Sequence, residues 1–103
     1  MKLKCAAGTL LLLASAAAMA QDRQALYLQG LAATFAACHG IDGRAHAGPG
    51  VAELAGMPAK NLVRQMAGFK SGTRPASVMQ QISKGYSDAQ IEQIARYFSS
   101  QRP

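Results

Sequence analysis

Cysteine, acidic residues and long apolar runs are all scarce in this chain of 103 residues. It contains two cysteines, no tryptophan, and five Asp and Glu against eleven Lys and Arg. The uncharged stretch 5–21 has a short leucine centre and is then rich in alanine, so it falls short of the roughly 20 apolar residues that span a bilayer. No window alternates apolar and polar residues long enough for a strand. These absences argue against stable membrane insertion and against a β-rich fold.

The amino-terminal segment has the three parts of a secretory signal peptide. Lys2 and Lys4 precede the apolar centre, and a small-residue triplet follows at residues 18–20. We therefore expect residues 1–20 to be removed and residues 21–103 to form a single periplasmic domain. The formal net charge of +6 would then fall to +4, with nine Lys and Arg against five acidic residues. These charges are scattered rather than grouped, which argues against nucleic acid as a partner.

Only one cysteine, Cys38, remains in the expected mature chain, because Cys5 leaves with the signal peptide. A domain of this size buries only about 60 to 65% of its unfolded surface and usually needs a disulfide, a metal or another staple. One cysteine cannot form an internal disulfide. In an oxidising compartment its thiol is free, bridges two molecules, or is consumed by a cofactor that also completes the core.

The two ends of the expected domain are predicted to be helices that pack on each other. Residues 23–37 lack proline, are rich in alanine and carry apolar residues at helical spacing. Gly30 inside this helix predicts the close approach of another helix, since glycine costs about 1 kcal/mol against alanine there. The partner would follow a capping box at residues 87–90, with Tyr97 and Phe98 as candidates to pack near Gly30. Its apolar face is formed by Ile91, Ile94, Ala95 and Phe98.

The middle of the chain is predicted to contain an ordered loop and two further helices. The loop spans residues 40–56 and includes Gly-Pro-Gly at 48–50. A helix is expected from Pro58 to near Gly72, and a shorter one over residues 77–84. The apolar stripe of the longer helix consists of Leu62, Val63, Met66 and Phe69. The predicted fold class is therefore all-α, a bundle of about four helices with long irregular loops.

The most informative segment is Phe35-Ala36-Ala37-Cys38-His39-Gly40. Covalent haem attachment normally uses Cys-x-x-Cys-His, in which two thiols bond the haem vinyl groups and the histidine binds the iron. Here Phe35 stands in place of the first cysteine. A single thioether from Cys38 would still tether a haem.

In this context the expected mature chain resembles small class I c-type cytochromes. The matching features, in the order of the family, are Gly30, Cys38-His39-Gly40, Gly48-Pro49, Leu62 to Phe69, Met79, and Ile91 to Phe98. Residues 69–87 look most like the cytochrome subunit of flavocytochrome c sulfide dehydrogenase, followed by cytochrome c4 and c553 type domains. The resemblance implies a helical fold wrapped around one haem c, an electron carrier rather than an enzyme, and a sulfide-oxidising flavoprotein with FAD as the partner.

The resemblance also implies the axial ligands of the iron. His39 would bind on the proximal side, with its other ring nitrogen donating to the carbonyl of Pro49. Met79 would bind on the opposite side, because methionine opposite histidine raises the reduction potential. Met66 lies on the apolar stripe and is expected in the core. Met57 lies too close to the proximal loop to reach the opposite face comfortably.

Other interpretations of these residues stay open. A haem-free interaction protein is favoured by Phe35, whose apolar bulk fills the thioether space, but it leaves Cys38, His39 and Met79 unexplained. An enzyme with open iron coordination, such as a peroxidase, needs Met79 to be displaced. Zinc at Cys38, His39 and His46 is disfavoured, because structural zinc takes four ligands in paired spacing.

Overall fold

The computed structural model describes residues 2–44 and 50–103, with side chains from residue 6 onward. The described elements are α1 Lys2–Ala33, α2 Ala36–His39, the 3-10 helix η1 Ile41–Gly43, α3 Ala59–Ser71, α4 Met79–Lys84 and α5 Asp88–Ser99. The described ranges contain no strand. The predicted all-α class is therefore confirmed.

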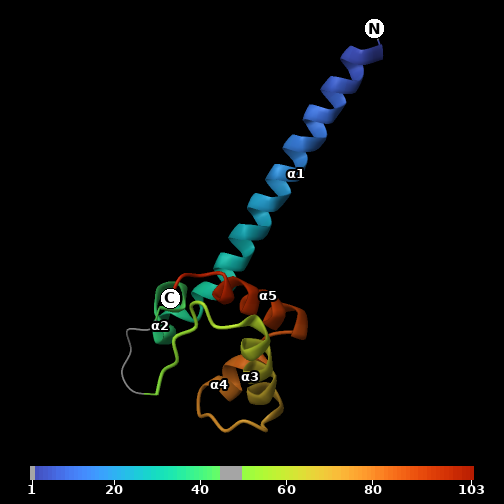
Figure 1. Ribbon diagram of the computed structural model, residues 1–103. Coiled ribbons are helices and arrows are strands. Elements are labelled where there is room, and N and C mark those ends of the chain that lie inside the picture. Colours follow the sequence, from blue (N-terminus) through green and yellow to red (C-terminus); the bar gives the residue numbers. More distant parts are fainter. Residues whose placement is uncertain (1, 45–49) are drawn as a thin grey trace.

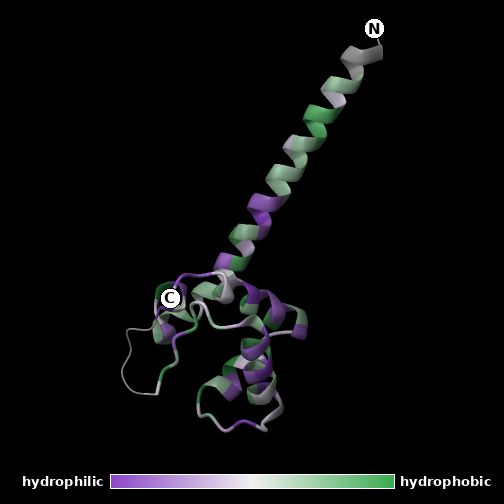
Figure 2. Cartoon of the chain, viewed as in Figure 1, coloured by the Kyte–Doolittle hydropathy of each residue, from purple (hydrophilic) through white to green (hydrophobic). Residues whose placement is uncertain are grey.

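Helix α1 projects far beyond the body that the other helices form (Figure 1). The apolar run from Leu10 to Leu13 lies on this projecting part, and each of its four leucines is at least 64% exposed. Figure 2 shows the same stretch as the most hydrophobic part of the helix. Among the described residues, no helix combines the length and the apolar character that a membrane crossing requires.

The predicted helix over residues 23–37 is interrupted near its end, which corrects the prediction. Helix α1 stops at Ala33, and a turn at Thr34 and Phe35 separates it from α2. The Thr34 hydroxyl donates to the carbonyl of Leu31 at 2.9 Å, and the Phe35 amide donates to the carbonyl of Ala32 at 3.1 Å. Such bonds to the preceding turn tighten a helix end. Phe35 thereby enters the core, where 4% of it stays exposed.

Gly30 is not the point where the terminal helices meet, so that prediction was wrong. A Cβ atom added to Gly30 would find no heavy atom within 4 Å, and the residue faces open space. Helices α1 and α5 do pack on each other, and nearby the ring of Phe35 meets that of Phe98 edge-on at 5.8 Å. Successive residues are about 100° apart around a helix, so Gly30 lies nearly opposite the buried Ala32.

Helix α5 forms the centre of the core and begins as predicted. The Ser87 hydroxyl accepts from the Gln90 amide at 3.1 Å, and the Ser87 amide donates to the Gln90 side chain at 3.0 Å, which completes the capping box. The predicted apolar face is buried, with none of its members more than 3% exposed: Ile91, Ile94, Ala95 and Phe98.

Helices α3 and α4 complete the body. Helix α3 follows Pro58 and ends before Gly72, whose left-handed backbone has φ 83°. In the predicted stripe, Leu62 and Met66 are buried, whereas Val63 and Phe69 are half-buried. Helix α3 packs against both α4 and α5. Helix α4 is two residues shorter at its start than predicted, and η1 is a short helical turn within a segment that was predicted to be loop.

A hydrogen bond between Tyr97 and Asp42 ties α5 to η1. The Tyr97 hydroxyl donates to the Asp42 carboxylate at 2.6 Å. Burial raises the pKa of Tyr97 from 10.0 to about 12, and the hydrogen bond to Asp42 acts in the same direction. The neutral hydroxyl is therefore favoured in the folded state. Its contribution to stability is fully present below pH 10 and is lost as the pH rises through the folded pKa near 12.

We expect the free energy of unfolding to fall more steeply between pH 10 and 12 in the parent protein than in Tyr97→Phe, because only the parent loses this contribution there. Urea unfolding at a series of alkaline pH values measures both slopes. Equal slopes would show that the Tyr97 hydroxyl ionises alike in the folded and unfolded chain.

Candidate functional site

A cavity of about 560 Å³ opens between the turn at Thr34 and Phe35, α2, the loop at residues 50–54, α3, the loop at residues 74–78, α4 and α5. This volume lies within the range of about 300 to 1,000 Å³ that is usual for small-molecule and cofactor sites. Its wall is mostly apolar and includes Leu54, Leu62, Phe69, Ile82, Ile91 and Phe98. Such a wall suits a large and mainly apolar group.

The predicted site residues Cys38, His39 and Met79 all line this cavity. Cys38 and His39 are neighbours in α2, and Met79 is the first residue of α4, forty residues further along the chain. The Cys38 thiol is free and exposed. The fold therefore brings a thiol, an imidazole and a thioether from two separate segments to one cavity.

The orientation of the His39 ring follows from one contact. Its Nδ1 atom lies 2.8 Å from the carbonyl oxygen of Ala52. A carbonyl oxygen only accepts, so Nδ1 carries the hydrogen, and the neutral ring keeps a lone pair on Nε2. This is the tautomer and the partner that metal-binding histidines commonly have. Pro49, whose carbonyl the resemblance implied as the acceptor, lies outside the described residues, and the described acceptor is Ala52.

The three methionines of the domain have different surroundings. Met79 is half-buried and lines the cavity. Met66 also lines the cavity, but it belongs to the core and is 6% exposed. Met57 does not line the cavity, and its sulfur lies 3.9 Å from the side-chain nitrogen of Gln65. The structure thus places two thioethers at the cavity wall, of which Met66 has the core position predicted for it.

Phe35 occupies the position of the missing cysteine, and its ring belongs to an aromatic cluster. Its ring stacks on Tyr86 at 5.7 Å between centroids, meets Phe98 edge-on at 5.8 Å and lies 6.4 Å from the His39 ring. The Tyr86 hydroxyl is 2.7 Å from that of Thr34, the residue before Phe35. Aromatic pairs at these distances contribute about 0.5 to 1.5 kcal/mol beyond their buried area. The cluster therefore holds the turn that precedes α2, the helix of Cys38 and His39.

Two residues of the cavity were missed by the predictions. Ala52 acts through its backbone carbonyl, which no side-chain pattern could reveal. Arg74 lines the cavity. The one sign of this in the sequence was that Arg74 stands shortly before the predicted ligand Met79 along the chain. His46 lies outside the described residues. In the part of the chain that the structure describes, no three His, Cys, Asp or Glu side chains group as a metal site.

On an all-α fold, the apolar cavity presents a thiol, an imidazole and a thioether, which are the donor types that c-type haem sites use. The chain is 38% identical over 71 residues to cytochrome c-554(548) of Halomonas halodenitrificans, covering 66% of this chain and 84% of that protein. It therefore belongs to the class I c-type cytochromes. No family model matches the chain.

Two further relatives are longer proteins. The chain is 37% identical over 84 residues to cytochrome c4 of Azotobacter vinelandii, and 38% identical over 93 residues to the thiosulfate dehydrogenase electron acceptor of Stutzerimonas stutzeri. These matches cover 73% and 86% of this chain, but only 40% and 43% of those proteins. The chain thus spans about two fifths of their length. The predicted likeness to cytochrome c4 is confirmed by these matches.

Proposed function

We propose that this protein is a periplasmic electron carrier that holds one haem c in the cavity through a single thioether at Cys38. The observation that carries the proposal is the convergence of Cys38, His39 and Met79 on one apolar cavity. When bound, the haem supplies reversible one-electron chemistry. The family to which the chain belongs supports the cofactor.

His39 and Met79 would hold the iron from the two segments that carry them. The Ala52 carbonyl fixes the His39 ring and leaves its Nε2 lone pair available for the metal. The Met79 sulfur is a soft donor that suits an electron-transfer site. If both side chains hold the iron, they would leave no place on it for a substrate, which favours a carrier over a peroxidase.

The cavity wall would keep water from the cofactor. Its apolar side chains come mainly from α3, α4 and α5, and several of them also belong to the hydrophobic core. Exclusion of water disfavours the more highly charged oxidised state and so acts on the reduction potential in the same direction as a methionine ligand. Phe35 contributes to this wall at the position where a second thioether would otherwise stand.

The electron donor we propose is an enzyme that oxidises a reduced inorganic sulfur compound, with a sulfide-oxidising FAD protein as the specific candidate. One relative at 38% identity is named a thiosulfate dehydrogenase electron acceptor. A second relative with the same name comes from Thiomonas intermedia. The excess of Lys and Arg over Asp and Glu suits association with an acidic donor surface.

Export through a signal peptide of residues 1–20 is part of the proposal, with residues 21–103 as the mature domain. The exposed leucines of α1 support it, since Leu10 to Leu13 are each at least 64% exposed and lie outside the hydrophobic core. A haem-free interaction protein is the second candidate function. It is favoured by Phe35, whose buried ring packs against Tyr86 and Phe98 at the position of the missing cysteine.

The proposal is tested by the intact mass and the pyridine haemochrome spectrum of the protein secreted from a host with cytochrome c maturation machinery. We expect the mass of residues 21–103 plus one haem, with the haemochrome band of a haem that keeps one vinyl group. Cys38→Ser should lose the covalent haem. An unmodified mass with a free thiol would support the haem-free function, and cyanide or carbon monoxide binding at neutral pH would support a peroxidase.

A further inference from the structure

Arg74 is the only Lys or Arg among the described residues that line the cavity, and no Asp or Glu lines it. The three ion pairs between described residues are Arg44 with Asp42, Lys70 with Asp88, and Arg96 with Glu92. None of them includes Arg74. The wall of an otherwise uncharged cavity therefore carries one positive charge without a carboxylate partner in the described chain.

The Arg74 backbone is held from two sides. Its amide donates to the carbonyl of Gly68 at 3.1 Å, and its carbonyl accepts from the Gln80 side chain at 3.1 Å. The loop before it is fastened to the same Gly68 carbonyl by the hydroxyls of Ser71 at 3.2 Å and Thr73 at 3.4 Å. A Cβ atom on residue 68 would lie only 3.1 Å from the Arg74 Cβ, so glycine there permits this close approach.

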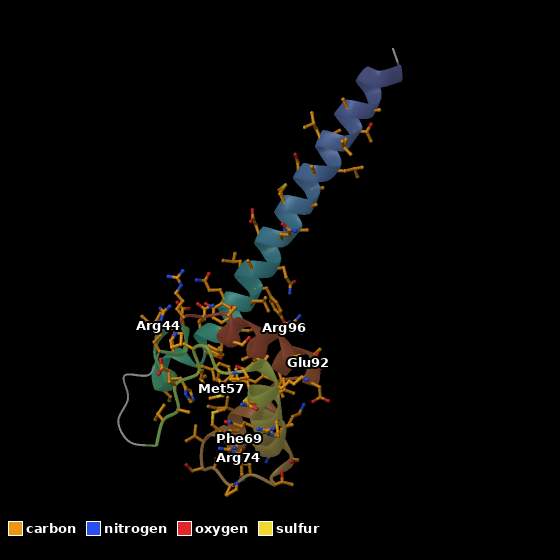
Figure 3. All side chains as sticks on the ribbon, viewed as in Figure 1. Arg44, Met57, Phe69, Arg74, Glu92 and Arg96 are labelled. Atoms are coloured by element: carbon orange, nitrogen blue, oxygen red, sulfur yellow. The ribbon has the colours of Figure 1, made fainter. Side chains whose placement is uncertain are left out.

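The Arg74 guanidinium lies over the face of Phe69, with its central carbon 5.1 Å from the ring centroid (Figure 3). Phe69 itself lines the cavity. A guanidinium over an aromatic face is attracted to the ring as a cation, which leaves its N–H groups available to a hydrogen-bond acceptor. Those N–H groups form a planar fork that matches the two oxygens of a carboxylate.

We propose that Arg74 binds a carboxylate of the group that occupies the cavity and so orients it, which for a haem means one of its propionates. This inference rests on the proposed function and extends it to a second, non-metal contact between protein and cofactor. Arg74 is exposed at the edge of an apolar wall, where it complements an occupant that is apolar in its body and anionic at its edge. Arg74 is thus a positioning residue that would hold the carboxylate edge of the group on the side of the cavity where Phe69 lies.

The proposal is tested on the haem-loaded protein by following the propionate resonances with NMR as the pH is varied. An arginine beside a carboxylate lowers the pKa of that carboxyl by about 1 to 3 units. We therefore expect Arg74→Met to raise the pKa of one propionate by about one unit or more. Arg74→Lys, which keeps the charge and loses the planar fork, should give an intermediate value.

Arg64→Met is the matched control, because it removes the same charge from a residue of α3 that is exposed, like Arg74, but does not line the cavity. It should leave both propionate pKa values unchanged. If Arg74→Met retains too little haem, the same titration of Arg74→Lys decides the question. Haem-loaded protein with unchanged propionate pKa values in the Arg74 variants would overturn this inference alone. Parent protein without haem would overturn the proposed function and this inference with it.

Discussion

His39→Ala should abolish the low-spin haem spectrum of the loaded protein. Among the described residues predicted to bind the iron, His39 is the one that offers a nitrogen donor. Because its Nδ1 atom donates a hydrogen bond to the Ala52 carbonyl, the lone pair on Nε2 is left free for the metal. Alanine offers no donor. Cys38 still carries its thiol in this variant, so haem attachment can be measured separately by mass. Absorption spectra of the oxidised and reduced protein check the loss.

The methionine variants serve as the comparison for His39→Ala. Met79→Ala should lose the charge-transfer band between methionine sulfur and iron while the protein keeps its haem. Met66→Leu should keep the band, since Met66 is expected to act as a core residue. Loss of the band in Met66→Leu and its survival in Met79→Ala would assign the iron ligand to Met66. A low-spin spectrum in His39→Ala would exclude His39 as a ligand.

Phe35→Ala should destabilise the protein by about 3 to 5 kcal/mol, which is typical for removal of a buried aromatic ring. Phe35 is 4% exposed and contacts Tyr86 and Phe98 through its ring. Loss of the Phe35 ring would leave an empty space beside the turn that precedes Cys38 and His39. Since domains of this kind are stable by only about 5 to 15 kcal/mol, the effect would be a large share of the total. Urea unfolding followed by circular dichroism measures it.

Two controls separate packing from the covalent chemistry at this position. Phe35→Leu should cost clearly less than Phe35→Ala, because it keeps most of the apolar volume. Phe35→Cys restores the two-cysteine spacing with Cys38 and should shift the haemochrome band to that of a haem with both vinyl groups consumed, while losing the ring contacts. A loss below 1 kcal/mol in Phe35→Ala would contradict a packing role for the ring.

Local features of the helices were predictable because they depend on neighbouring residues. The capping box at Ser87 and Gln90 needs only a hydroxyl and an amide three positions apart, and it formed as predicted. The end of α3 at Gly72 follows from the ease with which glycine adopts the left-handed backbone. The apolar faces of α3 and α5 follow from their helical spacing.

Gly30 and Phe35 show where such reasoning failed. Glycine in a helix predicts close approach, but the orientation of the helix against its partner decides whether the glycine faces that partner, and here Gly30 faces away. Alanine-rich spacing predicted an unbroken helix to residue 37. Instead, a turn at Thr34 and Phe35 interrupts the helix, and the Phe35 ring is buried against Tyr86 and Phe98.

The all-α class, most helix ends and the candidate residues Cys38, His39 and Met79 could be read from the sequence, because they depend on local hydrogen bonds, apolar periodicity and side-chain chemistry. The carbonyl that holds the His39 ring and the cation that reaches the cavity became known from the fold alone. Ala52 lies thirteen residues from His39, and Arg74 lines the cavity beside the ring of Phe69. Contacts between segments this far apart depend on how the helices pack, and the spacing of residues along the chain does not specify that packing.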